Sequence, residues 1–478
     1  MHSTSRWLIR NASAILTGRP GAAARAAGPD IRIVAGRIAA IGVLEPEPGE
    51  TQVDARECVV YPAWVNTHHH LFQSLLKGVP EGLDQSLGAW LSAVPSRYRG
   101  AFDEQSLRLA ARIGLVELAR SGCATVADHH YLYSPDMPFD GAAILFEEAE
   151  ALGLRFVLCR GGATQIGPRE AGTPAERRLE GLDSYLADVQ RLVATYHDPA
   201  PDAYRRIVMA PTSPPYSVSP AGLRETARAA RSLGIRLHSH LSETVDYLDE
   251  VQARHGMSPV AYCAEHGWVG DDVWFAHLVK LLPEEIQLLG ATRTGLAHCP
   301  QSNARLGSGI ADVVAMEAAG MRIALGVDGA ASNEACDMLS ETHAAWLLQR
   351  AKGGERALPR TAGGTREGGA HVASIEDVVR WGTAGGARVL GLEAVGTLDV
   401  GQAADIALYA LDDPRYFGLH DRAVGPVACG GRARLKALWV GGRRVVEDDR
   451  IPGLDMAELG RQANAAVIEL QRRVGVRR

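Results

Sequence analysis

Short apolar runs alternate with helical patterns through the middle of the chain. Eight apolar runs are expected to be strands: Val59–His68, Ala124–His129, Arg155–Arg160, Arg206–Pro211, Arg236–Leu241, Val273–Leu278, Gly295–Cys299 and Arg322–Asp328. The clearest helical patterns between them are Glu104–Arg120, Ala142–Leu152, Pro220–Leu233, Ile310–Ala319 and Cys336–Ala351. Eight β-α units predict an α/β fold of the (β/α)8 TIM-barrel type. A doubly wound sheet is the competing fold, but it usually has fewer strands and a Gly-x-Gly-x-x-Gly turn, which we do not find.

Both ends of the chain have a different, all-β pattern. The expected strands are Trp7–Leu16, Asp30–Val34 and Arg37–Ile41 near the N-terminus, and Ala404–Ala410 and Leu435–Val440 near the C-terminus. We expect the two ends to pair into one small β-sandwich, with a terminal helix over Met456–Val474 packing back on the body. The predicted domains are residues 1–60 and 394–478 for the sandwich and 61–393 for the barrel.

Two long segments interrupt the alternation. Gly78–Gly100 follows the first expected barrel strand and should therefore lie over the barrel mouth. Gly353–Ala370 is rich in glycine and arginine, and both a mobile loop and a plain surface insertion fit its composition.

Composition narrows the class of protein. The chain has 478 residues, 46% hydrophobic and 22% charged, with a net charge of −6, which gives no electrostatic footprint for nucleic acid. Seven scattered cysteines suit reduced thiols. Residues 1–16 lack the pattern of a signal peptide, and no uncharged run is long enough for a membrane helix. We therefore expect a cytoplasmic protein without a membrane or nucleic-acid partner.

Ionisable side chains gather where the expected strands end, which is where barrel enzymes place their active sites. The groups are His68-His69-His70, Asp128-His129-His130, Arg160, His238 to Glu243, His277, His298 and Asp328. Because strand side chains alternate, His68 and His70 point to one face and His69 to the other. Two imidazoles on one face make half of a metal site, although a polar cluster at a strand end is the alternative for these histidines alone.

Five of these motifs together resemble the amidohydrolase superfamily, and within it the cytosine/guanine-deaminase and chlorohydrolase-like branch. They are Asn66-Thr67-His68-His69-His70, His240-Leu241-Ser242-Glu243-Thr244, His277, His298-Cys299-Pro300-Gln301-Ser302-Asn303 and Gly326-Val327-Asp328-Gly329-Ala330. The resemblance implies that His68, His70, His240 and Asp328 bind one divalent metal. It also implies that Glu243 and His277 are acid/base groups.

The chemistry of these residues agrees with the resemblance. Three imidazoles and a carboxylate suit Zn²⁺, with Fe²⁺ as the alternative, and such a metal makes hydroxide from water near neutral pH. Asp328 and His277 could take the proton of that water, and Glu243 could protonate a ring nitrogen while ammonia leaves. The fourth expected strand and its end, residues 206–214, lack the lysine that bridges two metals in binuclear relatives, so one metal is predicted.

The substrate is expected to be a flat, aminated oxo-heterocycle. Five residues are candidates for binding it: Gln73, Trp90, Arg160, His129 and Asn303, with His130 and His238 completing the lining. Gln73 could instead be an exposed helix residue, Arg160 a strand-end salt bridge, and Trp90 an anchor of its loop.

Within the branch, His68 to Gln73 and Cys159-Arg160-Gly161-Gly162 are most similar to 8-oxoguanine and isoxanthopterin deaminases. We expect a pterin, isoxanthopterin, to be converted to 7-hydroxylumazine and ammonia. The alternatives are 8-oxoguanine or guanine deamination, an s-triazine hydrolase, and a metal-free scaffold without activity. A homodimer or higher homo-oligomer is expected from the resemblance only.

Overall fold

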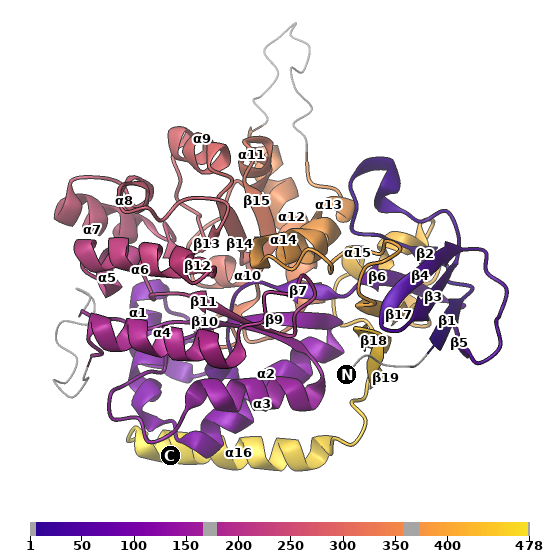
Figure 1. Ribbon diagram of the computed structural model, residues 1–478, viewed down its shortest axis with the longest axis horizontal. Coiled ribbons are helices and arrows are strands. Elements are labelled where there is room, and N and C mark those ends of the chain that lie inside the picture. The colour runs from indigo at the N-terminus through magenta and orange to yellow at the C-terminus, as the bar shows by residue number, and fades with distance from the viewer. Residues whose placement is uncertain (1–5, 166–178, 357–371, 477–478) are drawn as a thin grey trace, which may run out of the picture.

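The computed structural model describes residues 6–165, 179–356 and 372–476 and contains a parallel eight-stranded sheet curled into a barrel (Figure 1). Its strand order is β15-β14-β13-β12-β11-β10-β9-β7. The strands are β7 (Trp64–Asn66), β9 (Cys123–His130), β10 (Arg155–Arg160), β11 (Arg205–Met209), β12 (Arg236–Leu241), β13 (Val273–His277), β14 (Gly295–His298) and β15 (Arg322–Leu325). The predicted TIM-type barrel is confirmed. Residues 357–370, most of the Gly/Arg-rich segment, lie outside the described residues.

The barrel closes where its first and last strands meet. Thr67 donates both its N–H and its hydroxyl to the Leu325 carbonyl, at 3.0 and 2.8 Å. Just beyond, β8 (His69–His70) pairs in parallel with β16 (Asp328–Gly329), so that Asp328 lies opposite His69. A Cβ on Gly326 would lie 2.8 Å from the Cβ of His68, so only glycine allows the two chains to approach this closely. Closure therefore brings the first histidines next to Asp328.

The first expected strand, Val59–His68, is two strands in two different sheets. β6 (Cys58–Pro62) pairs antiparallel with β17 (Ile406–Ala410) in the small domain, whereas β7 belongs to the barrel. Pro62 has no N–H to donate, and at Ala63 the chain leaves one sheet for the other. Both strands are fully buried, so the apolar run continues across the break and the sequence pattern hides it.

Helices cover the outside of the barrel. The five expected from the sequence are α2 (Glu104–Arg120), α3 (Gly141–Leu152), α6 (Pro220–Ser232), α11 (Val313–Ala318) and α12 (Met338–Arg356). Others include α4 (Leu182–Tyr196), α7 (Val245–His255), α8 (Pro259–Glu265), α9 (Pro283–Ala291), α10 (Pro300–Arg305), α13 (Ile375–Arg380) and α14 (Gly386–Leu390). α16 (Met456–Arg473) runs back along the body, where Arg473 pairs with Asp103 at 2.7 Å (Figure 1). Among the described residues, no helix combines the length and apolarity needed to cross a membrane.

A small β-sandwich lies beside the barrel and uses both ends of the chain. One sheet contains β1 (Arg6–Arg10), β3 (Asp30–Val34), β4 (Arg37–Gly42) and β5 (Thr51–Asp54). The other has the order β19-β18-β17-β6-β2, with β2 (Ala14–Ile15), β18 (Leu435–Val440) and β19 (Arg443–Glu447). Ile9 and Ile31 of the first sheet share one buried core with Val60, Ile406 and Trp439 of the second. The two ends therefore pair as predicted, whereas the domain limits at residues 60 and 393 stay a prediction.

A buried ion pair joins the barrel to the sandwich. Arg155 at the start of β10 donates two hydrogen bonds to Asp405, at 2.8 and 3.1 Å, and the side chains are 1% and 4% exposed. The same carboxylate accepts from the Gly441 N–H at 2.6 Å, in the turn between β18 and β19. Asp405 therefore ties a barrel strand to a sandwich hairpin.

We predict that Asp405→Ala lowers the free energy of unfolding by about 3–5 kcal/mol, because it leaves the Arg155 guanidinium buried without its partner. Urea unfolding followed by circular dichroism measures the loss. The matched control is Asp399→Ala, which removes an exposed ion pair with Arg19 and should cost less than about 1 kcal/mol. Equal losses in the two variants would contradict the role given to the buried pair.

Candidate metal centre and active site

Five side chains from four strand ends converge above the barrel. His68 and His70 follow β7, His240 lies on β12, His277 ends β13, and Asp328 follows β15. Asp328 Oδ1 lies 3.3 Å from His68 Nε2 and 3.2 Å from His70 Nε2, and His70 Nε2 lies 3.2 Å from His240 Nε2. One ligand atom each from His68, His240, His277 and Asp328 falls within 4.8 Å of the others. The predicted ligands are therefore close neighbours.

Hydrogen bonds behind three of the imidazoles fix their tautomers. His70 Nδ1 donates to the His129 carbonyl at 2.8 Å, and His240 Nδ1 donates to the Thr212 carbonyl at 2.7 Å. His238 Nδ1 donates to the Trp274 carbonyl, which leaves His238 Nε2 to accept from His68 Nδ1 at 2.8 Å. The Nδ1 atoms of His68, His70 and His240 thus carry the proton, and the Nε2 atoms of these three residues present their lone pairs toward the shared centre.

The arrangement fits a tetrahedrally bound cation. Ligand atoms about 2.1 Å from a zinc ion lie about 3.4 Å from one another, close to the separations between these nitrogens and Asp328 Oδ1. His68 Nε2 is buried and has no hydrogen-bond partner, which a bound cation would supply. His68, His70, His240 and Asp328 could therefore hold one divalent metal.

The electrostatics of these groups favour cation binding. Burial lowers the pKa of His68 and of His240 well below the usual value, which keeps both imidazoles neutral. Burial acts against the charged form of His70 as well, but the Asp328 carboxylate outweighs it and raises the pKa of His70. Although burial opposes its charge, the neighbouring imidazoles of His68 and His70 hold the pKa of Asp328 well below its usual range. The centre therefore contains an ionised carboxylate beside the neutral imidazoles of His68 and His240.

Glu243 and His277 form a second pair at the edge of this centre. Glu243 Oε2 lies 3.7 Å from His277 Nε2, and its Oε1 accepts from the Ser308 hydroxyl at 3.0 Å. His277 Nδ1 donates to Asn303 Oδ1 at 2.9 Å, so His277 Nε2 is free to accept a proton. A carboxylate and an imidazole side by side can exchange protons with a molecule bound between them and the metal ligands.

Strained backbone marks the same strand ends. His277 has a φ of 77°, Asp328 a φ of 59°, and Ser242, next to Glu243, a φ of 51°. Left-handed conformations of non-glycine residues cost about 1–3 kcal/mol each and persist only where the surrounding structure enforces them. Here they turn the side chains of the strand ends toward the centre.

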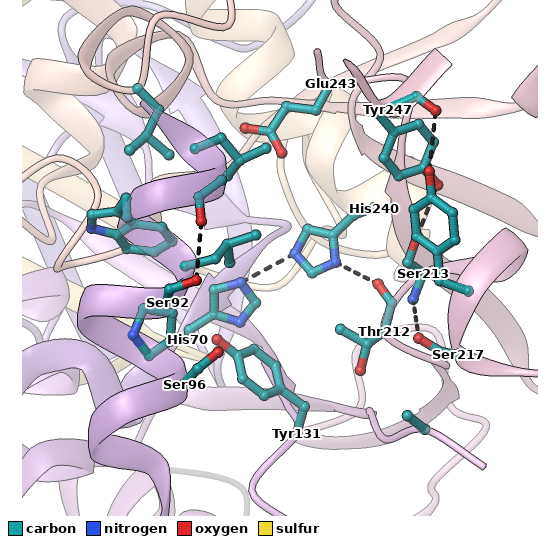
Figure 2. Close-up of a pocket in the computed structure, with 18 of the residues that line it drawn as sticks. His70, Ser92, Ser96, Tyr131, Thr212, Ser213, Ser217, His240, Glu243 and Tyr247 are labelled. Atoms are coloured by element: carbon teal, nitrogen blue, oxygen red, sulfur yellow. Dashed lines mark hydrogen bonds between the residues drawn. The ribbon is translucent and has the colours of Figure 1, made fainter. Parts of the chain in front are cut away.

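A cavity of about 200 Å³ opens above the ligands. Figure 2 shows His70 and His240 pointing toward one another across its middle, with Glu243 on one side and Tyr131 on the other. The segment from Gly78 to Gly100 covers the mouth as expected, and its α1 (Leu87–Leu91) and the turns after it contribute Leu87, Trp90, Leu91 and Arg99. The wall thus combines apolar surface with a few polar groups, as small-molecule sites do.

Two of the five expected substrate-binding residues line this cavity. Gln73 is fully buried in the short 3-10 helix η2 (Leu71–Leu75), where its amide nitrogen donates to the Tyr131 hydroxyl at 3.1 Å and its Oε1 has no partner. Gln73 is therefore not an exposed helix residue, which was the alternative considered for it. Trp90 presents its ring to the cavity while its indole N–H donates to the Ala331 carbonyl at 3.0 Å.

The other three expected substrate-binding residues lie elsewhere. Arg160 points outward to α4, paired with Glu180 and Asp188, because Cys159 occupies the inward position on β10. His129 lies beneath the ligands, stacked on His240 with its Nε2 bound to the Ala210 carbonyl. Asn303 holds His277, and none of the three is among the cavity-lining residues.

The two residues expected to complete the lining also have other contacts. His238 orients His68, as described above, and His130 faces Gly141 at the start of α3. Neither lines the cavity.

Several cavity residues were not expected from the sequence. Tyr131 directly follows the histidines of β9, Tyr216 lies on α5 (Pro214–Ser217), and Tyr247 on α7. All three come soon after the carboxyl end of a barrel strand, and this position was the available signal. The hydroxyls of Ser302 and Ser332 both donate to Asp328 Oδ2, at 2.6 and 3.1 Å. Ser302 lies in one of the five motifs, but the sequence did not indicate its role, and no motif includes Ser332.

Comparison with known proteins confirms the resemblance seen in the motifs. The model of the amidohydrolase family matches residues 59–445. An isoxanthopterin deaminase from an unknown prokaryotic organism is 63% identical over 472 residues, 98% of each chain. The 8-oxoguanine deaminase of Pseudomonas aeruginosa is 39% identical over 98% of this chain and 99% of that protein. The zinc complex of atrazine chlorohydrolase from Arthrobacter aurescens TC1 superimposes with a TM-score of 0.85 at 28% identity, covering 96% and 99% of the two chains. The chain therefore belongs to the amidohydrolase family.

Proposed function

We propose that this protein is a metal-dependent hydrolytic deaminase whose preferred substrate is isoxanthopterin, converted with water to 7-hydroxylumazine and ammonia. The observation that carries the proposal is the 63% identity to an isoxanthopterin deaminase across nearly the whole of both chains. The site chemistry supports the reaction class, because ionised Asp328, the unprotonated Nε2 of His277 and the Glu243 carboxylate border one cavity.

The metal is proposed to be a single Zn²⁺ held by His68, His70, His240 and Asp328. When bound there it would act as a Lewis acid that makes water nucleophilic near neutral pH. The zinc complex of the related atrazine chlorohydrolase supports this choice, with Fe²⁺ as the alternative.

His277 and Asp328 are proposed to accept the proton of the attacking water, since His277 Nε2 is unprotonated and Asp328 is ionised. Glu243, whose Oε2 lies 3.7 Å from His277 Nε2, then takes this proton from His277 and delivers it to the ring nitrogen next to the attacked carbon. Addition of the water oxygen at that carbon breaks the π bond of the ring C=N, and the ring stays closed. The C–N bond to the amino group then breaks, the second proton of the water oxygen passes to the amino group, and ammonia leaves behind a carbonyl.

Recognition of a flat bicyclic ring is proposed to use the cavity wall. Trp90 offers an aromatic face, and the Gln73 Oε1 without a partner could accept from a ring N–H. The hydroxyl of Tyr131 accepts from Gln73, so its own proton is available to a ring oxygen. 8-Oxoguanine presents a similar amino-oxo edge, and the 39% identical 8-oxoguanine deaminase makes it the second candidate.

A cytoplasmic location is proposed as well. All seven cysteines are unpaired and six are buried, which suits a reducing compartment. A homodimer stays a prediction from the family.

A substrate panel tests the proposed reaction. Ammonia release is measured with isoxanthopterin, pterin, 8-oxoguanine, guanine and an amino-s-triazine, and isoxanthopterin should give the highest kcat/KM. A higher value for 8-oxoguanine would move the assignment to the oxidised purine. No turnover of either pterin would reject the pterin as substrate.

We predict that Glu243→Gln lowers kcat by about 10²–10⁴-fold while the bound zinc stays near one per chain, because the residue moves protons and is not a ligand. Steady-state kinetics and metal analysis of the same preparation measure both quantities. Asp246→Asn, at an exposed carboxylate on α7, is the matched control and should keep full activity. A Glu243 variant with unchanged kcat would remove this residue from the mechanism.

Metal removal separates the enzyme from an inactive scaffold. Dialysis against a chelator should abolish ammonia release, and one equivalent of Zn²⁺ should restore it. His240→Ala should purify with little metal, whereas His420→Ala, at an exposed histidine, should keep its metal. Purified protein without metal, or a His240 variant as active as the parent, would favour the scaffold.

A further inference from the structure

The motif from His298 to Asn303 is part of the family resemblance, but none of its residues takes part in the proposed mechanism. Its last residues form α10, which continues into a turn that ends at Ser308. We call residues 300–308 the α10 segment. It follows β14, the strand next to β13 and β15 in the barrel.

Three side chains of the α10 segment contact three different catalytic groups. Ser302 donates its hydroxyl to Asp328 Oδ2 at 2.6 Å, and Asn303 Oδ1 accepts from His277 Nδ1 at 2.9 Å. Ser308 donates to Glu243 Oε1 at 3.0 Å. The three side chains are at most 1% exposed. In each pair the hydrogen bond is made to the atom of the catalytic group that faces away from the proposed reaction centre.

The α10 segment is itself firmly held. The Gln301 N–H and side-chain amide both donate to Glu341 of α12, at 3.0 and 2.5 Å. The turn folds back on the helix, because the Ser308 N–H donates to the Asn303 carbonyl at 2.8 Å. Gly307 has a φ of 70°, which glycine adopts without strain. The donors and acceptors of the segment therefore have fixed positions relative to one another.

The segment also reaches the substrate cavity. Leu306, between Asn303 and Ser308, lines the cavity wall, and its N–H donates to the Ser302 carbonyl at 2.9 Å. A ring bound in the cavity would thus contact the same short segment that holds the three catalytic side chains.

We propose that Ser302, Asn303 and Ser308 are positioning residues that fix Asp328, His277 and Glu243 as one unit. Ser302 leaves Asp328 Oδ1 for the metal, Asn303 keeps the His277 proton on Nδ1, and Ser308 holds Glu243 within reach of a ring nitrogen. The inference rests on the proposed function for the roles of His277 and Glu243. The role proposed for Ser302 concerns metal affinity, and its test needs no substrate.

Measurements of metal affinity test the role proposed for Ser302. Ser302→Ala should weaken Zn²⁺ binding by about 10–100-fold in a chelator competition, as is typical when an outer partner of a ligand is lost. In the Asp328→Ala background the same change should have no further effect, because Ser302 acts through Asp328. Ala304→Ser, at an exposed position on α10, is the control and should leave affinity unchanged. Unchanged Zn²⁺ affinity in Ser302→Ala, or an equal loss of affinity in the parent and Asp328→Ala backgrounds, would overturn the role proposed for Ser302.

Kinetics test the other two contacts. Ser308→Ala should lower kcat by about 10–100-fold with KM and zinc content nearly unchanged, and Ser308→Thr should restore kcat. Ser308→Ala should cost nothing more in the Glu243→Gln background, and Asn303→Ala should cost nothing more in the His277→Ala background. Additive losses would assign the three residues to general stability and overturn the proposal. If no compound of the panel is turned over while the Ser302 result holds, the proposed function fails and the metal-positioning role stands.

Discussion

The site depends on which ring nitrogen carries the proton in three imidazoles. His70 and His240 donate hydrogen bonds from Nδ1 to backbone carbonyls of the barrel. His68 donates from Nδ1 to His238, which is itself held by the Trp274 carbonyl. Side-chain chemistry is thereby set by main-chain atoms that cannot move without disturbing the sheet. The three Nε2 lone pairs and the Asp328 carboxylate then meet at one point. A bound cation would offset the repulsion between them, which is why these four side chains are proposed to hold a metal.

This arrangement requires unfavourable local structure that the rest of the fold must offset. Asp328 and His277 have left-handed backbone, and a carboxylate is kept ionised among buried groups. The surroundings that enforce it are rigid: the closure at Gly326, the parallel pair of β8 and β16, and the buried core around them. Stability and chemistry thus depend on the same contacts, because β7 and β15, which close the barrel, lead directly to His68, His70 and Asp328, three of the four predicted ligands.

The sequence predicts the fold, and it also indicates which side chains come together at the strand ends, because both depend on periodic or clustered residues. Strand ends that finish in histidine, as at His70 and His240, show where the chemistry collects, and amphipathic spacing finds helices such as α2. Local pattern cannot show partners that are distant in the chain. The run from Val59 to His68 looks like one strand because both of its halves are buried, in different sheets. Arg160 looks like a substrate contact until its outward direction and its acidic partners on and before α4 are known.

The pairing of β6 with β17 has a consequence for biosynthesis. Cys58 lies opposite Ala410, so β6 is made long before the strand that pairs with it. β7 and the first two histidines follow β6 directly, and the Asp328 that meets them at barrel closure is also made late. A nascent chain that stops before β17 exposes the apolar edge of β6 and lacks the support for the first strand of the barrel. The first strand of the barrel therefore gains its full support only after β17 has been made.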